Sequence, residues 1–245
     1  MSDVAALQVT LLGCTELPAV WHLQSLFAQE ISTRRDRAGA LILCEHPLAV
    51  TIGREGSLSD LRGERSEIQR RGIPVEWVRR GGGTWVHHPG QLLAYLIIPV
   101  ERLGLSVRTL SECWLESLCA LAEELEVKAE VVRQPLGIRG RCGQFAFVGC
   151  SIQQGITQFG ACLNVAVPRG ALMLSRWGSQ VRAGCLTAER MRPVLMARVR
   201  EAWQRHLARV LGYPHAHLFT GHPALQRTHR MHWTFCDPTA GKMTD

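Results

Sequence analysis

Apolar residues in this chain gather in short runs, and Gly, Pro or charged residues separate most of these runs from one another. Runs of roughly four to eight residues with such boundaries are typical of β-strands. Strands are therefore predicted at 9–12, 40–44, 48–52, 74–79, 92–98, 127–133 and 145–152, with a further strand ending near Val167.

Three stretches, 17–31, 110–125 and 195–211, instead carry apolar residues at every third or fourth position, which is the spacing of one helix face. Ser106 is the predicted N-cap of the second helix, while Pro193 and Gly212 stand near the two ends of the third. Residues 57–71 predict a polar, charged helix or loop. Residues 136–143 (LGIRGRCG) predict a loop.

Strands outnumber helices in this pattern and do not alternate regularly with them. The pattern favours one α+β domain, in which helices pack against a mixed, largely antiparallel sheet. We expect this domain to cover residues 1–212. Residues 213–245, which hold five of the ten histidines of the chain, are expected to form a C-terminal extension.

Composition narrows the class of protein. At 245 residues and 46% hydrophobic content the chain can bury a sizeable core, and its apolar runs are far shorter than the roughly 18 to 20 residues of a membrane span. The start (MSDVAALQVTLLGC) holds Asp3 and no basic residue, so a first strand is favoured over a signal peptide. Nine cysteines without a CxxC pair favour a reducing, cytoplasmic location over a disulfide framework.

The net charge of +7 predicts acidic partners. Nucleic acid is the weaker interpretation, because the arginines are dispersed and do not form a basic cluster interleaved with aromatic residues. An acidic protein is the stronger one.

Candidate chemistry centres on residues 79–91 (RRGGGTWVHHPGQ), between two apolar runs. Three consecutive glycines let a backbone approach a ligand closely, and Arg80 places a cation beside them. His87, His88 and Gln91 add hydrogen-bonding groups around a Pro-Gly turn. The alternative is a hairpin whose turn is rich in glycine and binds nothing.

The order of these residues resembles the RGGxxTxHxPGQ signature of the octanoyltransferases of lipoate synthesis, the LipB family. Residues 41–54 (LILCEHPLAVTIGR) resemble the EHPxxxTxGR stretch of that family. Residues 149–164 (GCSIQQGITQFGACLN) resemble a stretch that opens on a pocket glycine and closes on HGxALN. The resemblance runs from about Leu12 to about Glu189.

This resemblance implies a biotin/lipoate protein ligase-like fold, with octanoyl-acyl carrier protein and lipoyl domains as acidic partners and with no cofactor, membrane or nucleic acid. Three stretches are expected to line one apolar cleft for the acyl group. The substrate-binding residues it implies are Arg80, Gly81, Gly82, Gly83, Thr84, Trp85, Val86, His87, Phe147, Val148, Gly149, Gly160, Ala161 and Cys162.

Octanoyltransferases, as the resemblance implies, move an acyl group through a cysteine thiolate, with a lysine that lowers the pKa of the thiol. Here the lysine position falls on Gln144 and the cysteine position on Gly178, with Trp177 or Ser179 as neighbours if the spacing shifts. The histidine of the HG pair falls on Phe159. The threonine of the glycine loop falls on Trp85.

Three hypotheses follow. The first is an acyl- and carrier-binding protein that has lost the nucleophile, and the second is an active octanoyltransferase that uses a relocated thiol, Cys150 or Cys185. The third is a lipoate ligase-like enzyme, which would also need a lysine in the pocket. Zinc binding by the His-rich tail is a separate, weaker hypothesis, because its spacings match no standard pattern and the resemblance implies no metal.

Overall fold

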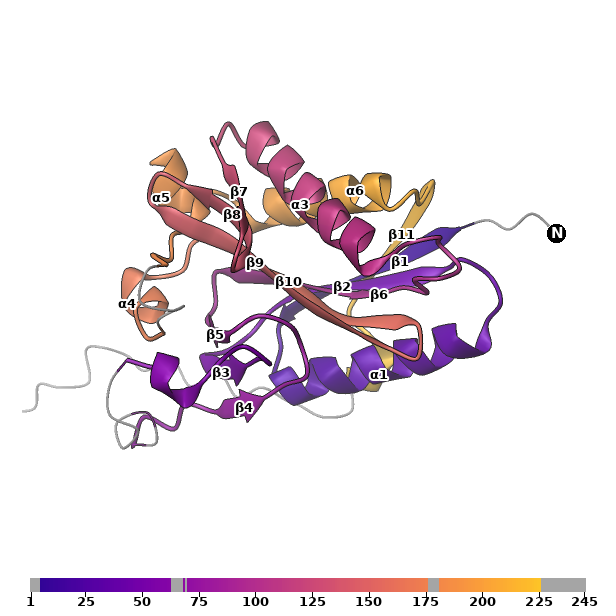
Figure 1. The fold of residues 1–245 in the computed structure, drawn as a ribbon, viewed down its shortest axis with the longest axis horizontal. Helices are drawn as coiled ribbons and strands as arrows, with labels where there is room; N and C mark the ends of the chain where they lie inside the picture. Colours follow the sequence, from indigo (N-terminus) through magenta and orange to yellow (C-terminus); the bar gives the residue numbers. More distant parts are fainter. Residues whose placement is uncertain (1–4, 63–67, 69, 176–180, 226–245) are drawn as a thin grey trace, which may run out of the picture.

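The computed structural model describes residues 5–62, 68, 70–175 and 181–225. Its main feature is an eight-stranded sheet, seen nearly edge-on in Figure 1, with the strand order β11-β1-β2-β6-β10-β9-β8-β7. The strands are β1 (Ala6–Cys14), β2 (Gly39–Glu45), β6 (Gln91–Ile97), β7 (Glu130–Arg133), β8 (Leu136–Gly140), β9 (Gly143–Gln153), β10 (Ile156–Asn164) and β11 (His215–Thr220).

Strands β11, β1 and β2 are mutually parallel, whereas every pair from β2 onward across the sheet is antiparallel. The prediction of an α+β fold with a mixed, largely antiparallel sheet is therefore confirmed.

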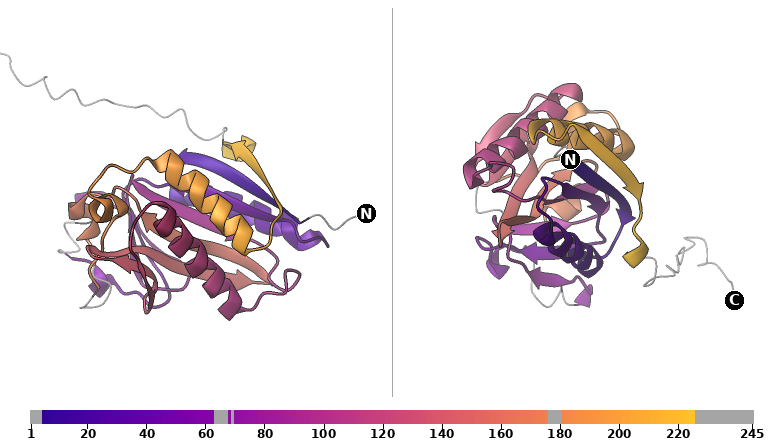
Figure 2. Two further views of the ribbon diagram at one scale, coloured as in Figure 1. Left: turned by 90° about the horizontal axis from the view of Figure 1, so that it is seen from above. Right: turned by 90° about the vertical axis from the view of Figure 1, so that its right-hand side faces the viewer.

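Helices cover both faces of this sheet (Figures 1 and 2). Helices α3 (Val107–Glu124) and α6 (Met196–Val210) lie on one face, where Trp114 and Trp203 pack edge to face with ring centroids 6.0 Å apart. Helix α1 (Leu17–Thr33) lies on the other face. Because side chains alternate along a strand, each face has its own apolar cluster, and we call these the α3/α6 core and the α1 core.

A second, three-stranded sheet lies on the same side of the large sheet as α1 (Figure 1). It consists of β3 (Ala49–Ile52), β4 (Val75–Trp77) and β5 (Thr84–His87), with β3 in the middle. Its outer face packs Val50, Ile52 and Val86 in a small cluster of their own. The alternation then places Thr51, Trp85 and His87 on the opposite face of this sheet.

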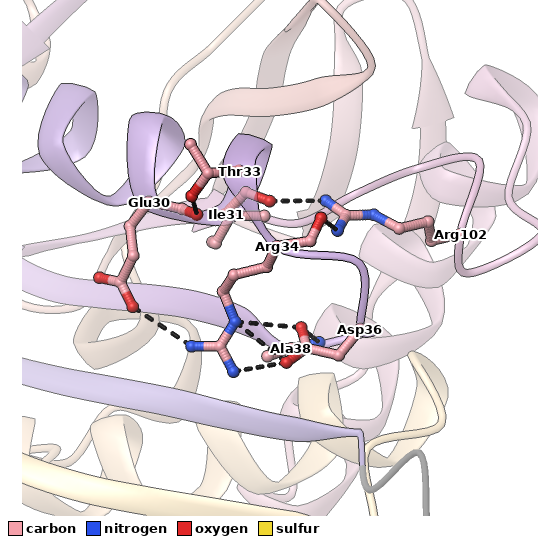
Figure 3. Close-up of polar contacts among 7 residues, drawn as sticks. All are labelled: Glu30, Ile31, Thr33, Arg34, Asp36, Ala38 and Arg102. Atoms are coloured by element: carbon pink, nitrogen blue, oxygen red, sulfur yellow. Dashed lines mark hydrogen bonds and ion pairs between the residues drawn. The ribbon is translucent and has the colours of Figure 1, made fainter.

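Charged side chains hold the end of α1 (Figure 3). The guanidinium of Arg102 donates to the main-chain carbonyls of Ile31 and Arg34, at the C-terminal end of the helix, where carbonyls run out of partners within the helix. Arg34 itself contacts Glu30 at 3.2 Å and Asp36 at 2.5 Å, and it lowers the pKa of Asp36. The helix is thereby tied to the loop that follows β6.

The observed elements match most of the predicted pattern. Ser106 is the N-cap of α3, as predicted, and it exchanges hydrogen bonds with Thr109 in a capping box. The loop predicted at 136–143 is wrong, because β8 occupies most of it. Gly137 permits this strand, since a Cβ there would lie 2.0 Å from the carbonyl oxygen of Ala146. Three short helices contain too few residues to show the helical period of apolar positions. They are η1 (Leu58–Asp60), α4 (Arg169–Leu172) and α5 (Leu186–Arg190).

The first part of the expected C-terminal extension belongs to the large sheet. His215–Thr220 forms β11, which pairs in parallel with β1 at the sheet edge, and a short helix, η2 (Pro223–Leu225), follows it. Residues 226–245, including most of the His-rich tail, lie outside the described residues. Within the described ranges, no helix is long and apolar enough to cross a membrane, and no group of three or more His, Cys, Asp or Glu side chains could hold a metal ion.

Candidate functional site

The glycine loop lies across strand β9 and contacts it at Gly149 and Cys150. The amide of Gly81 donates to the carbonyl of Cys150 at 3.1 Å. A Cβ on Gly149 would lie 2.5 Å from the carbonyl oxygen of Gly81 and 2.8 Å from Cζ2 of Trp85. Any side chain at position 149 would therefore collide with Gly81 and Trp85. The stretches around Gly81 and Gly149 lie together on one side of the large sheet.

Not every residue expected in the cleft faces it. Val148 points into the α3/α6 core. Thr84 donates to Asp60 at 2.8 Å, and the amide of Gly82 donates to Glu55 at 3.2 Å, so this part of the loop packs on the segment after β3. Val148 and Thr84 lie outside the cleft because side chains alternate along a strand, so neighbouring residues point to opposite faces.

Beneath the loop, between the two sheets, lies a small cavity that we call the glycine-loop cleft. It is lined by Trp21, Thr51, Val78, Arg80, Trp85, His87, Leu93, Ala94, Tyr95, Phe159, Gly160 and Ala161. Its volume is about 10 Å³, close to the minimum for one water molecule. Trp85, Phe147 and Cys162 line a neighbouring space of about 20 Å³. The cleft exists, but aromatic side chains nearly fill it.

The side chain of Phe159 reaches this cleft because its backbone adopts an unusual conformation. Its φ is +60°, a conformation that bulky residues rarely adopt, and its amide donates to the buried side chain of Gln24 at 2.6 Å. The ring lies between Trp21 and Tyr95, with centroid distances of 6.5 and 6.3 Å. The adjacent Gly160 allows β10 to approach β6, since a Cβ there would lie 2.1 Å from the carbonyl oxygen of Ala94.

Arg80 is buried beside the cleft, with 1% of its surface exposed. Its guanidinium lies over the ring of Trp85 and donates to the carbonyl and the hydroxyl of Thr51, at 2.9 Å each, and to the carbonyl of Gly81. Burial lowers the pKa of Arg80 to about 9, so it remains a cation at neutral pH. These acceptors are all neutral, and the positive charge is stabilised by dipoles and an aromatic face.

His87 continues this polar contact into a chain of hydrogen bonds. Gln91 donates its amide to Val86 and to Asn164, so its oxygen accepts from Nδ1 of His87 at 3.0 Å. Burial holds the pKa of His87 well below its ordinary value, which leaves Nε2 unprotonated and accepting from the Thr51 hydroxyl at 2.9 Å. Asn164 then donates to the carbonyl of Gly184 at 3.0 Å.

The resulting relay runs in one direction from Arg80 through Thr51, His87, Gln91 and Asn164 to Gly184. It joins both sheets to the segment that holds Gly184. Sequence reasoning assigned no role to Thr51 or Asn164 in this relay. Both stand in the stretches that carry the family resemblance, and that was the available signal.

A second buried histidine, His46, is also neutral. Nδ1 must donate to the carbonyl of Thr15, so Nε2 accepts from the hydroxyl of Tyr95 at 2.8 Å. Burial lowers the pKa of His46 to about 4 and raises that of Tyr95 well above its usual range. The pair fixes the Tyr95 ring against Phe159.

Gln144, at the expected lysine position, is 2% exposed and held by backbone. Its side-chain nitrogen donates to the carbonyls of Pro135 at 3.0 Å and Ala146 at 3.1 Å, which uses both of its N–H groups. Its main chain bonds Arg182 and Gly184. Gly178, at the expected cysteine position, lies outside the described residues.

The two candidate thiols and Cys162, which was expected to line the cleft, lie in different surroundings. Cys150 packs with the α3/α6 core, on the face of the sheet away from the cleft, and burial raises its pKa. Cys185 is the buried N-cap residue of α5. Cys162 lies on the cleft side, in the α1 core, and burial raises its pKa to about 12. Thiols with raised pKa values hold little thiolate and are poor nucleophiles at neutral pH.

The model of the lipoyl protein ligase A/B catalytic domain matches residues 18–175. An octanoyltransferase of Pseudomonas syringae pv. syringae (strain B728a) is 34% identical over 154 residues, which cover 63% of this chain and 67% of the relative.

The chain belongs to the lipoyl protein ligase A/B catalytic domain family. An octanoyltransferase of Aromatoleum aromaticum (strain DSM 19018 / LMG 30748 / EbN1) is 32% identical over 162 residues, 66% of this chain and 67% of the relative. The suspected relationship to the LipB proteins is thus confirmed.

Solved structures agree on the lipoate protein ligase fold. P. falciparum LipL1 in complex with lipoate superposes with a TM-score of 0.67 at 12% identity, over 87% of this chain and 66% of that one. A bi-partite lipoate protein ligase from Thermoplasma acidophilum gives 0.64 at 15% identity, over 91% and 89% of the two chains.

Next to Gln144 this family member carries a wide, charged groove of about 1040 Å³. Two of its basic residues are paired, Arg139 with Glu130 and Arg190 with Glu126. The remaining basic residues that line it are Lys128, Arg141 and Arg182. These cations are spread over three segments of sequence, so no local pattern could have shown them as one surface.

Proposed function

We propose that this LipB-like protein takes part in protein lipoylation as a binding protein, without the cysteine and lysine chemistry of an octanoyltransferase. It would recognise an acidic acyl carrier protein or lipoyl domain that carries an octanoyl or lipoyl group. The observation that carries the proposal is the side chain of Gln144, whose two N–H groups are committed to the carbonyls of Pro135 and Ala146.

A catalytic residue at this position would need to carry charge and exchange a proton. An amide does neither, and here it has no N–H left to donate to a substrate carbonyl. Without a cation beside it, a thiol keeps an ordinary or raised pKa and loses the rate advantage of a thiolate.

The charged groove supports the choice of partner. Lys128, Arg141 and Arg182 lie around a space large enough to receive part of another protein, and the whole chain carries a net charge of +7. Complementary charge speeds encounter and suppresses wrong partners. The related Thermoplasma acidophilum ligase was studied with its E2 lipoyl domain, and we extend that class of partner to this chain.

An active octanoyltransferase with a relocated thiol is the alternative. One observation favours it: Cys185 lines a cavity of about 400 Å³ together with Cys142, Arg169 and Arg182, so cations do line the space around this thiol. Cys150 fits the alternative less well, because the sheet separates its side chain from the cleft.

Intact mass spectrometry after incubation with octanoyl-acyl carrier protein tests both. The binding proposal predicts a stable complex on a gel-filtration column and an unchanged protein mass. A mass gain of one octanoyl group that hydroxylamine removes would indicate a thioester and contradict the proposal. Cys185→Ser and Cys150→Ser would then show which thiol had carried the group.

A further inference from the structure

We propose that Trp85 and Phe159 together determine which acyl groups the glycine-loop cleft can hold, and that they disfavour chains as long as octanoyl. This inference depends on the proposed function only for the chemical class of the ligand. Everything else in it comes from the packing of these two side chains.

The indole of Trp85 occupies the space that is free because Gly149 has no side chain. Its six-membered ring lies against Gly149, where even a Cβ would be 2.8 Å from Cζ2 and 3.0 Å from Cη2. Arg80 stacks on the ring with its guanidinium carbon 3.6 Å from the centroid. The indole is therefore clamped between a strand and a buried cation, and it cannot turn aside without breaking that stack.

Phe159 closes the cleft from the side of α1. Its left-handed backbone conformation, fixed by the hydrogen bond to Gln24, directs the ring between Trp21 and Tyr95. A residue in a normal strand conformation would point elsewhere. A bulky side chain at positive φ is strained, so the contacts around Phe159 must hold it in this conformation.

The size of the remaining space decides the specificity. The cleft retains about 10 Å³, whereas pockets that hold small molecules have volumes of roughly 300 to 1,000 Å³. Among the other lining residues, Val78, Leu93 and Ala94 are apolar and would suit a hydrocarbon chain. An acyl chain must therefore displace both aromatic rings, or it must be short enough to stay outside them.

Calorimetric titration with acetamide, butanamide, hexanamide and octanamide tests this inference in the full chain. In the unmodified protein we expect affinity that does not rise with chain length. In Trp85→Thr with Phe159→His, which restores the smaller side chain and the histidine of the related signature, each added methylene should lower Kd about fourfold. Octanamide should then bind at least about 100-fold more tightly than to the unmodified protein.

A matched control makes the same two chemical changes away from the cleft. Trp77→Thr with Phe219→His alters exposed side chains on β4 and β11, and this variant should behave like the unmodified protein. If the cleft variant is not folded by circular dichroism, Phe159→Gly, which suits the positive φ, replaces it and should also bind octanamide more tightly than the unmodified protein.

Two results would overturn the inference: octanamide binding as tightly to the unmodified protein as to the cleft variant, or a folded cleft variant whose Kd does not change with chain length. Biosensor binding of octanoyl-acyl carrier protein and of a lipoyl domain, measured on the unmodified protein, tests the proposed function separately. If the unmodified protein binds neither carrier, the proposed function is wrong, whereas the dependence of amide affinity on chain length is unaffected.

Discussion

Thr51 lies between Arg80 and His87, and its hydroxyl accepts from the arginine and donates to the histidine, at 2.9 Å in each case. One small side chain thus connects a buried cation to a neutral imidazole across strands β3 and β5. The hydroxyl group is required for this, since a methyl group of the same size can neither accept nor donate.

Thr51→Val should therefore destabilise the protein by about 1–3 kcal/mol, because it leaves Nε2 of His87 without a donor in a buried site. Thr51→Ser should retain most of the stability. Urea denaturation at pH 7 gives the comparison, with Thr33→Val, at the exposed end of α1, as the matched control. Equal stability of the Val and Ser variants would show that the relay contributes little.

Gly149→Ala is predicted to cost a similar amount, since the added methyl group would meet the carbonyl of Gly81 and the ring of Trp85. Gly170→Ala, in α4, meets no atom within 4 Å and should have little effect or stabilise slightly. Thermal unfolding of both variants checks this. A double-mutant cycle with Trp85→Thr should recover part of the loss, because the indole supplies part of the collision.

Acid sensitivity should follow from His46. Its pKa falls from 6.5 in the unfolded chain to about 4 in the folded protein, so between these values the unfolded state binds more protons. The corresponding stability, about 3 kcal/mol, is fully present above pH 6.5 and is lost as pH falls toward 4. The lowered pKa of His87 acts in the same direction.

Urea midpoints measured from pH 7 to pH 4.5 should thus fall steeply in the unmodified protein. His46→Gln should flatten this dependence, whatever it does to the stability at pH 7, while His22→Gln on the exposed face of α1 should leave it unchanged. A pH dependence of the same steepness in His46→Gln would exclude His46 as its source.

How far the sequence reveals this site depends on the kind of feature. Strand periodicity predicts the sheet, and the family resemblance predicts that the stretches around Gly81 and Gly149 meet. The side on which Val148 lies follows from the alternation of side chains within β9. The conformation of Phe159 depends on a contact with Gln24, far away in the sequence, which no local pattern contains. The hydrogen bonds of Gln144 to Pro135 and Ala146 depend on the pairing of β8 with β9, in a stretch whose pattern predicts a loop.

The final prediction concerns restoration of catalysis. Gln144→Lys with Gly178→Cys should gain acyl-enzyme formation with octanoyl-acyl carrier protein, because a cysteine and a lysine that work as a unit contribute far more together than either does alone. The carbonyls of Pro135 and Ala146, which now accept from Gln144, would hold the new ammonium group in its charged form. Either single change should gain little, and Gln144→Lys alone should destabilise the protein by burying a cation near residue 144 without its partner thiolate.

Trp85→Thr with Phe159→His should then increase the yield of acyl-enzyme in the restored protein, since the chain to be transferred needs the cleft that these residues fill. Mass spectrometry with and without hydroxylamine measures each step. If the restored pair stays unacylated even in the opened cleft, position 178 does not face position 144, and the spacing on which its assignment rests is wrong.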